Sequence, residues 1–215
     1  AVDGTINSVN IGKGANSVSN NTVLGEGALD ASVTGNNNIA IGASALTENT
    51  SGADNSGVGT GALANNTTGS QNTAIGRRAL RDNTTASNNT ALGFDALSAN
   101  TTGTVNTAVG SGALDANTTA SANTAIGTNS LTTTTTGSDN TAVGYLSLEK
   151  NTTGSFNTCI GKSVLQENTT GTRLVAVGAF ALDANTTANN NVAVGYTALT
   201  ANTTGGNNTA LGDQC

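Results

Sequence analysis

The sequence predicts an all-β protein, a β-solenoid (β-roll) of stacked seventeen-residue coils, and three observations lead to this prediction. One glycine recurs every seventeen residues from Gly25 to Gly212, without insertion or deletion. The residue before this glycine is always a branched aliphatic, and leucine stands four residues after it in every complete unit. A fixed short period of this kind is typical of a solenoid, because each unit buries its apolar side chains only by stacking on its neighbours.

The repeating unit is rich in β-branched residues and turn formers. Its consensus is N-T-A-[IVL]-G-x-x-A-L-x-x-N-T-T-G-x-x. The Thr-Ala-Ile/Val run and the Thr-Thr run predict two short strands per coil, with turns at the glycines. Alternation along the first strand puts threonine and the aliphatic on one face, and asparagine and alanine on the other. We expect the aliphatic and leucine ladders to form the core, with equivalent residues ~4.8 Å apart. Seventeen residues with two glycines leave no room for a pair of helices.

A ladder of small residues runs through the same strand, two positions before each repeated glycine. It begins with Val23, Ala40 and Gly57, continues mostly as alanine, and includes Cys159. Exclusion of large and charged side chains indicates close approach to another surface, either a partner chain or the opposite wall of the coil. One aliphatic and one leucine per unit make a thin core for a lone solenoid, which favours a homotrimer over a monomer or another closed assembly.

We expect one continuous elongated domain. Residues 25–215 form the regular repeats, and residues 1–24 form shorter coils at the N-terminal end. About twelve stacked coils would extend roughly 50–60 Å. The chain ends within a unit, at Cys215, so we expect the sequence to be a piece of a longer chain.

Six positions per unit vary, and we expect them at solvent-facing corners. From residue 26 onward every charged residue lies in one of these positions, and charged side chains are almost never buried unpaired. All five aromatic residues lie there as well. The candidate residues for surface contact are therefore the aromatic residues and one small basic cluster: Phe94, Tyr145, Phe156, Phe180, Tyr196, Arg77, Arg78 and Arg81.

Three of these aromatic residues share one position, directly after the repeated glycine. Phe94, Tyr145 and Tyr196 are fifty-one residues apart, which is three units each time. We expect them to line up along one edge at ~14 Å intervals. They could contact a glycan or a protein partner, but they could equally shield the turn or pack on a neighbouring chain of a trimer.

The composition argues against several classes of function. The net charge is −6, whereas nucleic acids and anionic membranes require a basic face, so we expect neither as a partner. The chain has no histidine and no recognisable catalytic, phosphate-binding, zinc or calcium motif. We therefore expect no enzyme, no cofactor and no metal. Cys159 and Cys215 stand in small-residue positions, too far apart for a mutual disulfide, and are interpreted as apolar fillers. No segment is apolar and long enough to insert into a membrane.

The Asn-Thr-Thr run, or a near variant, recurs in nine units and matches the N-glycosylation sequon, for example at Asn66, Asn100 and Asn151. Its repetition at the period of the coil favours a structural role instead. Stacked asparagine and threonine can hydrogen-bond their own backbone and the coils on either side. Glycosylation is the weaker of the two interpretations.

The N-terminal residues 7–18, N-S-V-N-I-G-K-G-A-N-S-V, resemble the head repeat of YadA-type trimeric autotransporter adhesins. That repeat carries an N-S-V-A-I-G core at a spacing of about fourteen residues; here Gly12 and Gly25 are thirteen residues apart, and Asn10 replaces the alanine. The following units, such as residues 72–85, resemble longer variants found in bacterial surface fibres and phage tail fibres. The resemblance implies a homotrimer of β-rolls and an extracellular location, on a bacterial cell surface or a virion tail fibre.

We therefore expect a structural and binding segment of an extracellular fibre, either an adhesin head or a phage tail fibre. Its partners would be two further copies of itself and a host surface glycan or protein, held by weak contacts made many times. The alternative is an ice- or surface-binding β-solenoid that uses asparagine and threonine ladders. The adjacent threonines of each unit count against this alternative, because alternation sends them to opposite faces.

Overall fold

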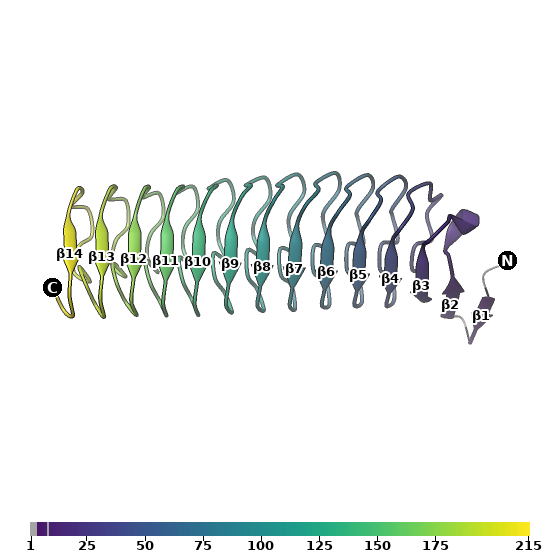
Figure 1. Cartoon of the computed structure of the whole chain (residues 1–215), viewed down its shortest axis with the longest axis horizontal. Helices are drawn as coiled ribbons and strands as arrows, with labels where there is room; N and C mark the ends of the chain where they lie inside the picture. Colours follow the sequence, from purple (N-terminus) through teal and green to yellow (C-terminus); the bar gives the residue numbers. More distant parts are fainter. Residues whose placement is uncertain (1–3, 8) are drawn as a thin grey trace.

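A computed structural model describes residues 4–7 and 9–215 and shows an elongated β-solenoid (Figure 1). Fourteen short strands lie side by side in one sheet, in the order of the sequence. No α-helix occurs among the described residues, and a 3₁₀ turn, η1, spans Ala15–Ser17. The strands are β1 (Gly4–Ile6), β2 (Val9–Gly12), β3 (Thr22–Gly25), β4 (Ile39–Ile41), β5 (Ser56–Val58), β6 (Thr73–Ile75), β7 (Thr90–Leu92), β8 (Thr107–Val109), β9 (Thr124–Ile126), β10 (Thr141–Val143), β11 (Thr158–Ile160), β12 (Val175–Val177), β13 (Val192–Val194) and β14 (Thr209–Leu211).

The seventeen-residue period of the sequence is the register of the sheet. From β3 to β14 each strand pairs in parallel with the next, and every residue faces the one seventeen positions later. These eleven pairings define about eleven full coils, close to the twelve that the sequence predicts. The solenoid prediction is confirmed.

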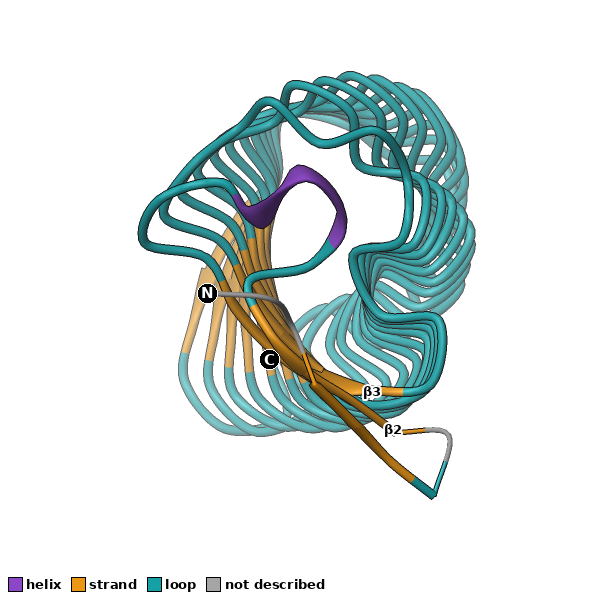
Figure 2. Ribbon diagram, turned by 90° about the vertical axis from the view of Figure 1, so that its right-hand side faces the viewer, coloured by secondary structure: helices purple, strands orange, loops and turns teal. Residues whose placement is uncertain are grey.

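The prediction of two strands per coil is wrong, because each coil contains one strand. The Thr-Thr run forms a bend instead, although it still bonds to the next coil: Thr67 donates its backbone N–H to the carbonyl of Thr84 at 2.8 Å, and its Oγ1 donates to the same carbonyl at 2.9 Å. Viewed along the stack, the strands occupy one side of the coil and loops close the rest (Figure 2).

The N-terminal end is built differently from the expected short coils. β1 pairs with β2, and β2 with β3, in antiparallel fashion. The parallel register begins only at β3, where Thr22 faces Ile39. The pairing of β1 and β2 therefore forms a hairpin against the first coil, rather than further turns of the same solenoid.

The strand faces are also the reverse of the prediction. The middle residue of each strand, alanine in most coils, is fully buried, whereas the threonine before it and the aliphatic after it point outward. The cause is space inside the coil. A Cβ added at Gly57, which occupies the middle position of β5, would lie 3.4 Å from Cδ1 of Leu46. The leucine ladder fills the interior, so the strand facing it has room only for small side chains. Of the two alternatives for the small-residue ladder, close approach to the opposite wall is therefore correct.

The leucine ladder is the centre of the core. Ten leucines, from Leu29 to Leu182, are fully buried, one per coil. Every leucine of the ladder has a positive φ, between 48° and 54°, which L-residues other than asparagine and aspartate seldom adopt. Each coil thus combines a strained backbone with a fully buried side chain, and burial of about 2 kcal/mol per leucine exceeds the local cost of about 1 kcal/mol.

The repeated glycine has two reasons to be glycine. From Gly42 to Gly212 its φ lies between 125° and 142°, a region that L side chains rarely adopt. It also lies against the next coil: a Cβ on Gly110 would be 2.5 Å from the carbonyl oxygen of Gly127. No other residue fits this turn without moving the neighbouring coil.

Two ladders of buried asparagine hold the bends together. The first contains the asparagine before each strand from β3 to β14, except before β12, where Leu174 takes its place. The second contains the asparagine of the Asn-Thr-Thr run. Asn55 of the first ladder and Asn66 of the second each donate Nδ2–H to the carbonyl of Gly69, both at 2.9 Å. Asn66 also donates to Oδ1 of Asn49, one coil earlier, at 2.9 Å. Asn66, Asn100 and Asn151 are fully buried, so the structural interpretation of the sequon is confirmed.

The second ladder has one defect. Thr134 stands where the other coils have asparagine, and it offers no amide N–H to the preceding coil. Oδ1 of Asn117 consequently lacks a partner, and it is the one buried side-chain polar atom in that condition among residues 4–7 and 9–215. The Thr134 hydroxyl points toward the following coil instead and donates to the carbonyl of Asn151 at 3.1 Å.

Candidate functional site

The most regular exposed surface is the outward side of strands β3–β14, here called the outer strand face. It consists of two parallel ladders, one mostly of threonine and one of branched aliphatic residues. The members are Thr22, Ile39, Ser56, Thr73, Thr90, Thr107, Thr124, Thr141, Thr158, Val175, Val192 and Thr209 in the first, and Leu24, Ile41, Val58, Ile75, Leu92, Val109, Ile126, Val143, Ile160, Val177, Val194 and Leu211 in the second.

This face is free of charge along its whole length, and its aliphatic ladder is an unbroken apolar stripe. Ile75, Leu92 and Ile126 are 40–45% exposed, and similar exposure recurs in other coils. None of the outward strand residues carries a charge. A contiguous row of exposed apolar side chains is a candidate interaction site. Sequence reasoning missed it, because the aliphatic ladder was assigned to the core.

A second candidate surface is the glycine corner, defined as the two residues that follow each repeated glycine. It contains six of the eight predicted contact residues: Arg77, Arg78, Phe94, Tyr145, Phe180 and Tyr196. Backbone bonds between coils fix its register, since Gly112 donates its N–H to Phe94 at 3.0 Å and Ser163 to Tyr145 at 2.9 Å. Phe94, Tyr145 and Tyr196 therefore follow one edge of the stack at three-coil intervals, as the sequence predicts.

Near the C-terminal end, four successive coils of the glycine corner carry a group here called the aromatic row: Tyr145, Lys162, Phe180 and Tyr196. Nζ of Lys162 lies 5.4 Å from the ring centroid of Phe180. The rings of Phe180 and Tyr196 meet edge to face, with centroids 6.1 Å apart and an interplanar angle of 86°. Tyr145 and Tyr196 are 50% and 51% exposed. Sequence reasoning missed Lys162, although its position one coil after Tyr145 in the same column indicates it.

A smaller basic group lies on the same corner toward the N-terminus. The guanidinium carbons of Arg77 and Arg78 are 5.5 and 5.4 Å from the ring centroid of Phe94. Arg78 also forms an ion pair with Asp95, in which Nε donates to Oδ1 at 2.7 Å.

The two remaining predicted contact residues lie on other corners. Arg81 follows the leucine and pairs with the adjacent Asp82, Nε to Oδ1 at 2.8 Å. Phe156 follows the second glycine of its unit and is 61% exposed. The structure therefore brings the predicted residues into two groups and leaves these two apart.

The side chains that could carry chemistry are few. Cys159 takes the place of alanine in the buried ladder, and burial raises the pKa of its thiol, which keeps it protonated and unreactive. Cys215 stands three residues after Gly212, in the position that other coils fill with alanine, serine or valine, and is exposed. Within residues 4–7 and 9–215, no group of three or more histidine, cysteine, aspartate or glutamate side chains could hold a metal ion. In the same part of the chain no helix has the length and apolarity needed to cross a bilayer.

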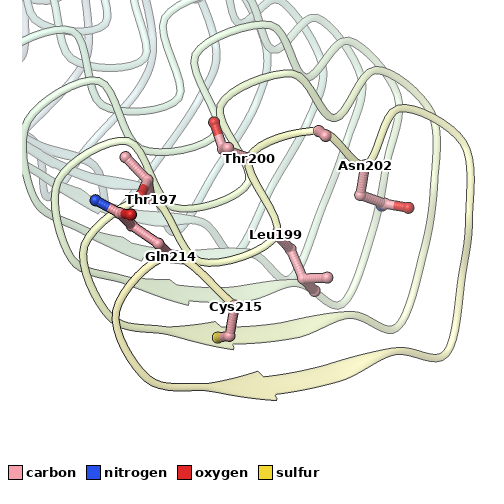
Figure 3. Close-up of a pocket in the computed structure, with 7 residues that line it drawn as sticks. Thr197, Leu199, Thr200, Asn202, Gln214 and Cys215 are labelled. Atoms are coloured by element: carbon pink, nitrogen blue, oxygen red, sulfur yellow. The ribbon is translucent and has the colours of Figure 1, made fainter.

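Residues of the last coils line a pocket at the C-terminal end of the stack (Figure 3). Its lining includes Thr197, Leu199, Thr200, Gln214 and Cys215. Leu199 belongs to the leucine ladder but is only partly buried. The pocket therefore opens onto the interior of the coil at this end of the described stack. No charged side chain lines it.

Comparison with protein families, with curated proteins and with solved structures finds no match to this chain.

Proposed function

We propose that this protein is a structural segment of an extracellular fibre, in which three copies of the chain associate along their outer strand faces. The observation that carries the proposal is the absence of charge on that face together with its unbroken aliphatic ladder. Strand propensity within a single chain favours branched residues at these positions but does not exclude polar ones such as threonine, whereas packing against a second copy does.

The number of copies and the location come from the resemblance to trimeric adhesins and phage fibres. A parallel arrangement around an axis along the stack supports the proposal energetically, because each ladder residue then meets its own counterparts at the same height. Each threonine of one copy would lie at the same height as the same threonine in the other two copies. Val175 and Val192, which replace threonine in this ladder, would likewise face their own counterparts. The corners remain on the outside, where a repeated column of side chains allows multivalent attachment to a host surface.

The test is the state of association in solution. Sedimentation of the purified chain should give a trimer, and the double variant Ile126→Lys/Ile160→Lys should sediment as a single chain. Both side chains are exposed in the individual solenoid, so the variant should keep its β-type circular dichroism. The matched control is Ser111→Lys/Thr128→Lys, which adds the same charge at the glycine corner and should remain trimeric. A wild-type chain that stays monomeric at all accessible concentrations refutes the proposal.

A second candidate function is the binding of ice or another ordered surface by the same face. The two asparagine ladders are buried and present no surface, but the threonine ladder points outward beside the aliphatic ladder. From the sequence these two ladders are predicted to share one face, but that face is assigned to the interior. Inhibition of ice recrystallisation by the single chain, lost in Ile126→Lys/Ile160→Lys and retained in the corner control, would favour this function. No inhibition would exclude it.

A further inference from the structure

The aromatic row is an unusual concentration for this chain. Only five aromatic residues occur in 215, and three of them lie within four successive coils on one corner, together with Lys162. The coils before Tyr145 place serine, glycine, threonine and asparagine in the same slots (Ser111, Gly112, Thr128 and Asn129). The corner itself therefore does not need aromatic side chains.

The row is also distinct in its charge. Lys162 is the one charged residue of the glycine corner between Asp95 and Asp213. It lies over the Phe180 ring rather than beside a carboxylate, and a cation held in this way retains its affinity for an anion. The protein as a whole carries a charge of −6, so this position is a local site of positive charge on an acidic molecule.

We propose that the aromatic row binds an acidic polysaccharide, that is, a chain of sugar rings that bear carboxylates. The flat C–H faces of sugar rings stack on exposed aromatic rings without needing a cavity, and the half-exposed rings of Tyr145 and Tyr196 offer such surfaces. Lys162 lies between them along the stack and provides a charge-assisted partner for a carboxylate. This inference rests on the proposed fibre function, because it names the partner that the corner would hold.

The shape of the site favours a polymer over a compact ligand. The row runs parallel to the stack axis, with coils spaced ~4.8 Å apart, so it presents its contacts one after another in a line. On the same edge, Phe94 lies three coils before Tyr145, and Arg77 lies one coil further from it. An extended chain bound to the row can therefore continue to a second aromatic and cationic group, which raises its affinity by multivalency.

The experiment uses the intrinsic fluorescence of the protein. Tyr145 and Tyr196 are the two tyrosines of the chain, which has no tryptophan, so tyrosine emission reports on the aromatic row alone. The probe is an oligogalacturonate, and the matched ligand is its methyl ester, which has the same sugar rings without the negative charge. We expect a saturable change in emission with the acid and binding weaker by about tenfold or more with the ester.

Variants of the full chain separate the roles of the side chains. Lys162→Gln should abolish the preference for the acid over the ester, and Phe180→Ser should weaken the binding of both. The controls are Lys150→Gln, which removes a lysine on another corner, and Phe156→Ser, which removes an exposed aromatic on another corner; both should bind as the wild type does.

Three outcomes would overturn the inference: no change in emission with either sugar, equal binding of poly-glutamate, or loss of association instead of sugar binding in Phe180→Ser. The first means that the row is no sugar site, the second that it takes any polyanion, and the third that it is a contact between copies. Sedimentation of the same samples keeps the two proposals apart. A trimer without sugar binding refutes the inference alone, and a sugar-binding monomer refutes the assembly alone.

Discussion

The outer strand face and the glycine corner are both exposed in the single chain, yet the repeat treats them differently. Position by position, the corner accepts arginine, aspartate, glycine, serine or tyrosine, whereas the third residue of each strand is always leucine, isoleucine or valine. Strand propensity explains part of this regularity, since branched residues favour strands. It does not explain the exclusion of every polar residue from a ladder whose members are partly exposed or, as at Ile75 and Ile126, 40% exposed or more. A residue type that is repeated at an exposed position in every coil therefore indicates packing against another molecule.

The largest effect should come from placing a charge in the interior. Leu114 is fully buried, and Leu114→Asp would put an unpaired carboxylate among stacked leucines, at a cost of about 4 kcal/mol or more. Ser111→Asp, at the glycine corner of the same coil, should change the free energy of unfolding by less than ~0.5 kcal/mol. Thermal or denaturant unfolding of both variants measures the difference, and equal stabilities would contradict the assignment of inside and outside.

The next largest effect on stability should distinguish the repeated glycine from the glycine that follows the Asn-Thr-Thr run. Gly110→Ala would place a methyl group 2.5 Å from the Gly127 carbonyl oxygen at a φ of 134°, which should cost about 2–3 kcal/mol. Gly103→Ala is the control. A Cβ on Gly103 would also lie close to a carbonyl oxygen, 2.2 Å from that of Ala120, but Gly103 does not have a positive φ. The equivalent position is already alanine at Ala86 and Ala120, so the fold accommodates a methyl group there and this variant should unfold within about 1 kcal/mol of the wild type. A Gly110→Ala protein as stable as Gly103→Ala would show that the turn is not constrained in this way.

Repair of the ladder defect should stabilise the protein. Thr134→Asn supplies the N–H that Oδ1 of Asn117 lacks, and satisfying a buried acceptor should add about 1 kcal/mol to the free energy of unfolding. Thr136→Asn, exposed in the same coil, should be neutral. If Thr134→Asn destabilises the fold instead, the hydroxyl bond from Thr134 to the Asn151 carbonyl outweighs the missing one.

The smallest effect concerns charges at the corners. The hydrogen bond from Arg81 lowers the pKa of Asp82, against the opposing effect of partial burial. The pair therefore contributes stability above the pKa of an unfolded aspartate, and this contribution is lost as the pH falls through the lowered value. Because both side chains are about one-third exposed, the contribution should be a few tenths of a kcal/mol at most. Unfolding of Asp82→Asn and of the wild type should differ slightly at neutral pH and converge in acid.

The sequence was sufficient to predict the coil, its period, the stacking register and the corners, because glycine, leucine and the charged residues each mark their positions by chemistry. It could not decide which side of the strand faces inward. Both sides carry one apolar and one polar residue, as in Asn72 and Ala74 against Thr73 and Ile75, so the pattern is symmetrical. The choice depends on two features of the folded coil. One is the positive φ that turns each leucine into the interior. The other is the buried backbone carbonyl, such as that of Gly69, that accepts hydrogen bonds from the asparagine side chains.

The candidate surfaces were predictable to different degrees. The columns of Phe94, Tyr145 and Tyr196 follow from the period alone, whereas the contact of Lys162 with Phe180 needs the side-chain positions of adjacent coils. The outer strand face could not be predicted as a surface, because the sequence pattern does not show which side of the strand points outward.

The direction of the hydrogen bonds between coils has a mechanical consequence. Most backbone bonds join one coil to the next, as between Gly110 and Leu92 or Leu97 and Ala113, and so lie along the length of the rod. A force that pulls the two ends of a single chain apart would load the terminal coil first and detach it while the others stay closed. Each detached coil would release seventeen residues of slack, roughly 55 Å. A rod of this kind would extend in equal steps, which a single-molecule force–extension measurement on one chain would record. Neighbouring chains that shared the load would raise the force needed for each step.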